Sequence, residues 1–183
     1  MIFLCLGTGC AALAGAWFLR PLLDADRATA RNDDGTALTL YAEAENRFKR
    51  LGLARRLLRP PHDDAVFNQL ALLYRAGEHE AVLQKAAAAT AAAGSHFWAG
   101  TALLRRALTE QEPDAQLAWL ERAEQELALA LTAHPDAWDT KFNYEMTARL
   151  MARLRQEPEK RPGPLLQLLR PQAGEPRPKR RVG

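Results

Sequence analysis

The sequence predicts an all-α fold, with an apolar N-terminal helix followed by antiparallel helix pairs. The 183-residue chain is rich in Ala, Leu, Arg and Glu and poor in Val, Ile and aromatic residues, which favours helices because straight-chain side chains lose little freedom in them. Apolar residues also recur at intervals of three and four, the spacing of one helix face. A chain of this length has room for one modest domain with appendages.

The first element is the uncharged run Ile2–Leu19, which is closed by Arg20 and carries Trp17 and Phe18 near its end. Roughly 20 apolar residues cross a bilayer as a helix, and aromatic residues favour its interfaces. We therefore expect a single-pass membrane anchor over residues 1–23. A cleaved signal peptide is the alternative, but a basic leader and a small-residue cleavage site are missing.

Charges around this run leave the topology open. No Lys or Arg precedes the run, whereas Arg20, Arg27 and Arg31 follow it. The positive-inside rule would then keep the remainder of the chain in the cytoplasm. A start codon assigned too far downstream would remove a basic leader and produce the same pattern.

A linker and a basic amphipathic helix are expected over 24–61. The polar linker spans 27–36 and contains a turn signal at Asp34-Gly35. The helix begins at Ala37, has apolar residues at helical spacing, and ends before Pro60-Pro61 because proline lacks the backbone donor that a helix needs.

A domain of five helices is expected over 62–156, with breaks at Gly and Pro. The first begins at Asp63 or Asp64, either of which can cap a helix N-terminus. The five run from there to Ala76-Gly77, from Glu78 to Ala93, from Phe97 to Thr109, from Pro113 to His134-Pro135, and from Asp136 to Glu157.

Large apolar residues in the last of these helices lie four apart and therefore share one face, which we expect to pack into a neighbouring helix. They are Trp138, Phe142, Met146, Leu150 and Leu154. We expect the tryptophans of the domain to fill contacts between helix pairs as well. These are Trp98, Trp119 and Trp138.

The tail, 157–183, is rich in proline, glycine and basic residues and is expected to be mostly disordered. Its apolar stretch PLLQLLR would dock on the domain or a partner, or form a local clip. Charge is segregated along the chain, because Asp63–Leu150 holds 7 basic and 13 acidic residues while both flanks are basic. Solvated charge is the favoured interpretation of the flanks, and binding of anionic lipid or nucleic acid is the alternative.

Motifs for catalysis are missing from the sequence. The four histidines are never paired at metal-binding spacing on a helix, and no hydrolase or nucleotide-binding motif occurs. Both cysteines, Cys5 and Cys10, lie in the apolar run. We therefore expect no enzyme activity, no cofactor and no metal site.

The candidate binding residues come from a repeated D-x-x-F-N pattern, in which Asp and Asn are four apart and share a helix face. An asparagine amide can both donate to and accept from a peptide backbone, and an aspartate favours basic or neutral ligands. The alternative is that the aspartates cap helices and the asparagines bond locally. The phenylalanine recurs at Phe97 without the polar pair, which indicates a packing role for it. The candidate partner-binding residues are Asp64, Asn68, Asp139 and Asn143.

Three segments resemble tetratricopeptide repeats. They are LYRAGEHEAVL with Gly77 at a turn, FWAGTALL with Gly100 at a close helix contact, and ALTAHP with Ala130 and Pro135. The resemblance implies a right-handed α-solenoid of antiparallel helix pairs, each of which buries its apolar face on the next.

Taken in order behind the apolar run, LYRAGEHEAVL, FWAGTALLRRAL and PDAWDTKFNYEMTARL resemble MxaK, a small accessory family encoded with methanol dehydrogenase. This resemblance implies a membrane-anchored periplasmic protein that assists maturation of a quinoprotein dehydrogenase, at its metal-loading stage. Neighbours of that family include von Willebrand-type and AAA ATPase proteins, so a general scaffold for such an envelope complex is the alternative. The expected partner is a protein in both cases, and no nucleic acid is expected.

Overall fold

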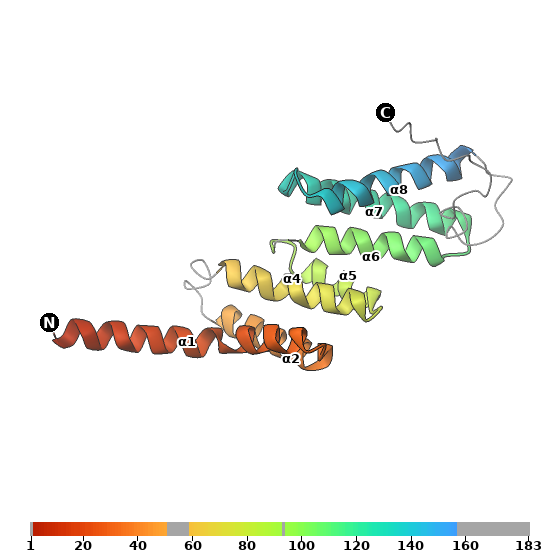
Figure 1. The fold of residues 1–183 in the computed structure, drawn as a ribbon. Coiled ribbons are helices and arrows are strands. Elements are labelled where there is room, and N and C mark those ends of the chain that lie inside the picture. The colour runs from red at the N-terminus through yellow and green to blue at the C-terminus, as the bar shows by residue number, and fades with distance from the viewer. Residues whose placement is uncertain (1, 51–58, 93, 157–183) are drawn as a thin grey trace, which may run out of the picture.

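The computed structural model describes residues 2–50, 59–92 and 94–156, with side chains from Gly15 onward (Figure 1). Within these ranges it contains seven helices and no strand, which confirms the all-α prediction. The helices are α1 Ile2–Ala30, α2 Asp34–Arg50, α4 Arg59–Arg75, α5 His79–Ala88, α6 Ser95–Thr109, α7 Pro113–Ala133 and α8 Trp138–Gln156. The expected tail, 157–183, lies outside the described residues.

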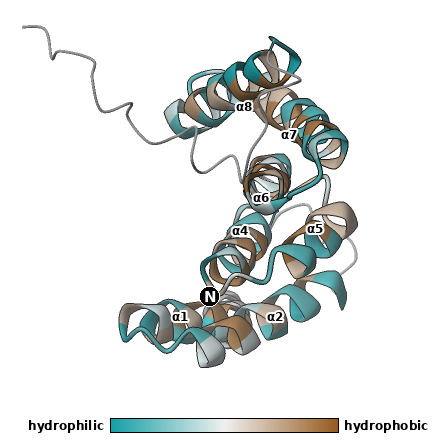
Figure 2. Ribbon diagram, turned by 90° about the vertical axis from the view of Figure 1, so that its right-hand side faces the viewer, coloured by the Kyte–Doolittle hydropathy of each residue, from teal (hydrophilic) through white to brown (hydrophobic). Residues whose placement is uncertain are grey.

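The helices stack in chain order, from the α1–α2 pair at one end to the α7–α8 pair at the other (Figures 1 and 2). Each helix packs mainly on the helices next to it in sequence, and α6 also contacts α4 and α8. The N-terminal half of α1 projects beyond the rest of the stack (Figure 1).

Three separate apolar clusters hold the stack together, one at each junction, in the nearest-neighbour manner of repeat folds. Tyr41 and Phe48 centre the cluster between α1, α2 and α4. Val66 and Leu70 belong to the cluster between α4, α5 and α6. Leu103, Leu120 and Leu150 join α6, α7 and α8.

Two glycines have the structural roles that the sequence predicted for them. Gly77 has φ +81° in the turn between α4 and α5, a conformation that residues with a Cβ rarely adopt. Gly100 lies where α6 crosses α7, and a Cβ there would be 2.6 Å from Leu127 Cγ. The close contact of these two helices therefore depends on the missing side chain.

The predicted linker over 27–36 is wrong, because α1 continues to Ala30 and α2 begins at Asp34. Only three residues separate the two helices, and Asn32 has φ 57° in this turn. The Thr36 backbone N–H donates to Asp33 Oδ1 at 3.2 Å, so Asp33 caps α2 and Asp34-Gly35 falls inside its first turn.

Pro60 and Pro61 begin a helix, where the sequence was interpreted as ending one. They lie in the first turn of α4, where a missing N–H costs nothing because those donors have no helical acceptor. Since α4 starts at Arg59, Asp63 and Asp64 are inside it and the predicted capping role is wrong for both. Residues 51–58, the end of the predicted amphipathic helix, lie outside the described residues.

The α1 helix passes through Pro21 without interruption. Proline has no N–H, so the carbonyl of Trp17, four residues earlier, loses its helical donor. Arg47 Nη1 of α2 donates to that carbonyl oxygen at 2.9 Å, and the guanidinium carbon lies 4.4 Å from the centroid of the Trp17 ring. A side chain of α2 thus replaces the hydrogen bond that Pro21 removes from α1.

None of the helices in the described part of the chain is both long and apolar enough to cross a membrane. The predicted anchor, 1–23, forms part of α1, and the side chains of its first 14 residues lie outside the described part.

Candidate functional site

The two predicted Asp–Asn pairs lie on α4 and α8. Asp64 and Asp139 are exposed, whereas Asn68 and Asn143 are half-buried. The structure does not bring the two pairs into contact with each other: α6 packs on both α4 and α8. All four residues therefore stay candidates for partner contact.

Both asparagine side chains also make contacts between helices. Asn143 Nδ2 on α8 donates to Thr101 Oγ1 on α6 at 3.2 Å. Asn68 on α4 faces the hydroxyl of Tyr41 on α2 and acts to lower its pKa. Burial, and then a 2.6 Å hydrogen bond to the Asp26 carboxylate, raise the pKa of Tyr41 to about 12, so this hydroxyl stays protonated and donates to Asp26. The amides therefore serve to hold neighbouring helices in register.

Aromatic side chains at the same register of α4 and α8 are on the surface. Phe67 is 38% exposed, Phe142 57% and Trp138 75%. The expectation that Trp138 and Phe142 pack into a neighbouring helix is therefore wrong, and only Met146, Leu150 and Leu154 of that ridge pack in the core. The physical reason is that no described element follows α8 to cover this face.

Phe67 joins the surface to a layer of aromatic rings between α4 and α6. Its ring meets that of Trp98 edge-on at 5.6 Å, and Trp98 also contacts Phe97 at 5.1 Å and Tyr74 at 5.4 Å. Trp98 Nε1 is buried without a hydrogen-bond partner. The prediction that Trp98 fills a contact between helix pairs is confirmed, since it packs against the α4–α6 cluster.

We call Phe67, Phe97, Phe142 and Trp138 the aromatic row. Its members lie on the alternate helices α4, α6 and α8. Phe67 and Phe97 both touch Trp98, and Asn143, which follows Phe142 in sequence, bonds to Thr101, one turn from Phe97. The exposed carboxylates of Asp64 and Asp139 flank it, each three residues before a phenylalanine. The surface is therefore apolar with an acidic margin.

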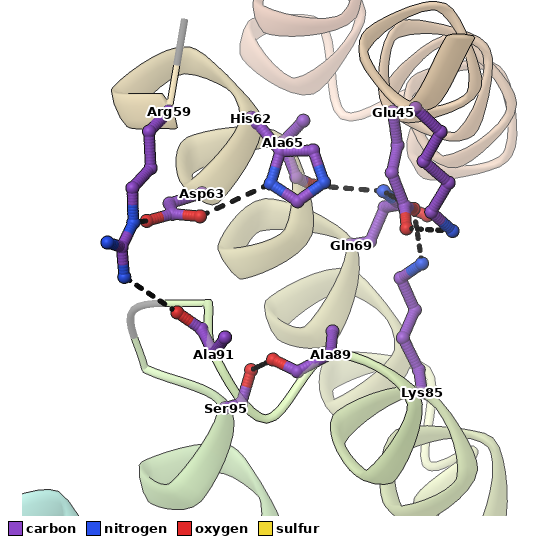
Figure 3. Close-up of polar contacts among 11 residues, drawn as sticks. Glu45, Arg59, His62, Asp63, Ala65, Gln69, Lys85, Ala89, Ala91 and Ser95 are labelled. Carbon is purple, nitrogen blue, oxygen red and sulfur yellow. Dashed lines mark hydrogen bonds and ion pairs between the residues drawn. The ribbon is translucent and has the colours of Figure 1, made fainter. Parts of the chain in front are cut away.

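A buried carboxylate that sequence reasoning missed lies on the other side of α4. Glu45 on α2 is 4% exposed and accepts from Lys49 Nζ at 2.7 Å, Lys85 Nζ at 2.5 Å and Gln69 Nε2 at 2.9 Å (Figure 3). Burial raises the pKa of Glu45, but the hydrogen bonds from Lys49, Lys85 and Gln69 outweigh it and lower the pKa to about 2. Glu45 is ionised at neutral pH and ties α2 to α4 and α5.

A pocket of about 490 Å³ adjoins this cluster and is lined by α2, the start of α4 and the turn after α5. Asp63 Oδ1 lies 3.2 Å from Nδ1 of the buried His62, which favours the tautomer with the proton on Nδ1. Nε2 is then an acceptor, and it is buried without a partner. Arg59 lies 3.5 Å from Asp63 and donates to the carbonyl of Ala91 at 3.2 Å, closing one side (Figure 3).

The lining of this pocket is balanced in charge, because the cations Lys49 and Arg59 each pair with an acid, Glu45 and Asp63. His62 and Asp63 come from one helix turn, and Glu45 is committed to its three donors. Among the residues described, no group of three His, Cys, Asp or Glu side chains is placed to hold a metal ion. The arrangement suits structural linkage of α2, α4 and α5 better than chemistry on a substrate.

Comparison with known proteins identifies no relative: no protein-family model, no curated protein and no solved structure matches this chain.

Proposed function

We propose that the protein is a non-enzymatic helical adaptor that binds a protein partner through the aromatic row. The observation that carries the proposal is the exposure of Trp138 and Phe142 on adjacent turns of α8, beside Asp139. Aromatic side chains carry much of the binding energy of protein interfaces, and exposed apolar patches on soluble surfaces mark binding sites.

The charges at the margin favour a particular kind of partner segment. Asp64 and Asp139 would repel a carboxylate and attract Lys or Arg side chains, so the segment is apolar with basic or neutral flanks. In this proposal the asparagines Asn68 and Asn143 set the spacing of the helices that present the row, and their remaining polar atoms are available to the partner backbone.

The helix pairs extend this proposal to a right-handed α-solenoid of the tetratricopeptide type, in which alternate helices line one binding face. Three features support it: the antiparallel pairs, the contacts of α6 with both α4 and α8, and the glycines at Gly77 and Gly100. In the same proposal residues 1–23 anchor the chain in the inner membrane and leave the helical stack in the periplasm, as the resemblance to MxaK implies.

The resemblance to MxaK supplies the narrower form of the proposal, in which the partner belongs to the apparatus that matures a methanol dehydrogenase and loads its metal. A scaffold for a von Willebrand-type and AAA ATPase envelope complex is the alternative form. The identity of the captured partner separates them, since only the first form requires a dehydrogenase or its own maturation factors.

The test is quantitative affinity capture of the tagged chain from its native cells. The double variant W138A/F142A is compared with L129A, a matched control because Leu129 is an exposed apolar residue, 50% exposed, on α7. Removing two aromatic contacts should lower partner recovery at least tenfold, since such contacts contribute roughly 1 kcal/mol or more each. L129A should recover the partner at the wild-type level. Equal recovery with all three chains would refute the proposal.

A further inference from the structure

The end of the stack from which α1 projects carries a group of basic residues, all of them exposed except Arg47, which is half-buried. Arg20 lies on α1, Arg47, Lys49 and Arg50 lie in the last turn of α2, and Arg59 begins α4. The contact of Arg47 with Trp17 fixes the C-terminal end of α2 beside the middle of α1. These residues therefore lie close to the point where α1 leaves the stack (Figure 1).

The projecting half of α1 belongs to the uncharged run Ile2–Leu19, whose last residues, Phe18 and Leu19, pack on the cluster between α1, α2 and α4. A helix of this length is about 27 Å long, close to the roughly 30 Å thickness of the hydrocarbon core of a bilayer. Trp17 lies near its inner end and is 63% exposed, and Arg20, whose side chain is 77% exposed, follows one turn later. This order, apolar run, tryptophan, then arginines, matches the layers of a membrane from core to headgroups.

We propose that this end of the stack rests on anionic lipid headgroups, with Trp17 at the interface and Arg20 and Arg50 among the phosphates. The proposal rests on the membrane anchor of the proposed function and adds an orientation to it. Because α1 is continuous from Ile2 to Ala30 and is clamped to α2 by Arg47, the helical stack is not tethered by a linker. It is held rigidly at one height and angle, with its basic end towards the membrane.

The experiment uses the full chain, with Cys5 and Cys10 changed to alanine, reconstituted in phosphatidylcholine vesicles with or without phosphatidylglycerol. An environment-sensitive dye is attached at N46C or, as the matched control, at T39C. Both positions are exposed on α2 and share a face two turns apart, but Asn46 lies at the basic end and Thr39 does not.

The dye at position 46 should shift to the blue in anionic vesicles and much less in neutral ones, and the dye at 39 should shift in neither. The shift should disappear in 1 M salt, where the Debye length falls to about 3 Å. The double variant R20E/R50E should abolish it, whereas R27E/R31E, a matched pair at the other end of the α1–α2 hairpin, should preserve it.

Equal emission at positions 46 and 39, or equal loss from both charge-reversed pairs, would overturn the proposed surface contact. Flotation of the same vesicles separates this failure from that of the anchor. A chain that floats with neutral and anionic vesicles but shows no shift at position 46 retains the anchor and lacks the headgroup contact. A chain that floats with neither lacks both.

Discussion

At the scale of single residues, the most consequential side chain is Glu45. It lies between two lysines that are 36 residues apart in sequence, Lys49 on its own helix and Lys85 on α5, and a glutamine of α4 completes its hydrogen bonds. A carboxylate so deeply buried stabilises the fold only while it stays ionised, because breaking such a cluster leaves uncompensated charge in a dry environment.

The pKa of Glu45 is lowered from its ordinary 4.5 to about 2 in the folded protein. Its stabilising contribution, about 3 kcal/mol, is therefore fully present above pH 4.5 and is lost as the pH falls towards 2. Urea unfolding in nonionic detergent should show E45Q less stable than the wild type at pH 7 by that amount, with the gap closing in acid. E121Q, which removes an exposed pair with Arg155, should differ by under about 0.5 kcal/mol throughout. A difference in the free energy of unfolding between E45Q and the wild type that does not change with pH would contradict this account.

Part of this cluster was open to prediction and part was not. Glu45 and Lys49 are four apart, which already places them on one helix face, but Lys85 and Gln69 reach Glu45 only after α2, α4 and α5 have packed. The D-x-x-F-N repeats were likewise predictable only as far as contacts within one helix. Spacing could show that Asp, Phe and Asn recur, but not that Asn143 would turn towards Thr101 while Phe142 stayed on the surface.

At the scale of elements, α1 and α2 behave as one unit because Arg47 completes the backbone of α1 beside Pro21. The sequence predicted an apolar run closed by Arg20 and a polar linker over 27–36, whereas α1 continues to Ala30 through Pro21, a residue that disfavours helix interiors. What overrode that local preference was a donor from another helix, which has no signature in the local sequence. Glycine and proline were better guides at the α4–α5 turn and at the start of α7, where backbone conformation alone decides the boundary.

A double-mutant cycle tests this repair. P21A restores an N–H for the Trp17 carbonyl, so R47A should cost about 1–2 kcal/mol in the wild-type chain and clearly less in the P21A background. R47K keeps the charge but cannot combine the carbonyl bond with guanidinium stacking on Trp17. Its free energy of unfolding should therefore lie between those of the wild type and R47A. Chemical unfolding followed by circular dichroism supplies the four free energies. A coupling energy of zero would mean that Arg47 does not act through Pro21.

At the scale of the whole molecule, packing between sequence neighbours leaves Trp138 and Phe142 on the outer face of α8 uncovered within the described residues. Helix content, the breaks between helices from α4 onward and the close approach at Gly100 follow from composition, periodicity and turn residues. The location of the proposed binding surface does not follow from them, because a helix with an uncovered face has the same apolar pattern as one that is covered. Trp138 and Phe142 therefore looked like core residues in sequence and are surface residues in the structure.

The central claim, that the aromatic row is the partner-binding surface, is tested most directly by site-specific photo-crosslinking in living cells. A photoreactive phenylalanine analogue replaces Phe67, Phe142 or, as the control, the exposed Gln125 of α7. The account predicts that positions 67 and 142 crosslink to one and the same protein and that position 125 does not. No crosslink from 67 or 142, or the same products from all three positions, would contradict it.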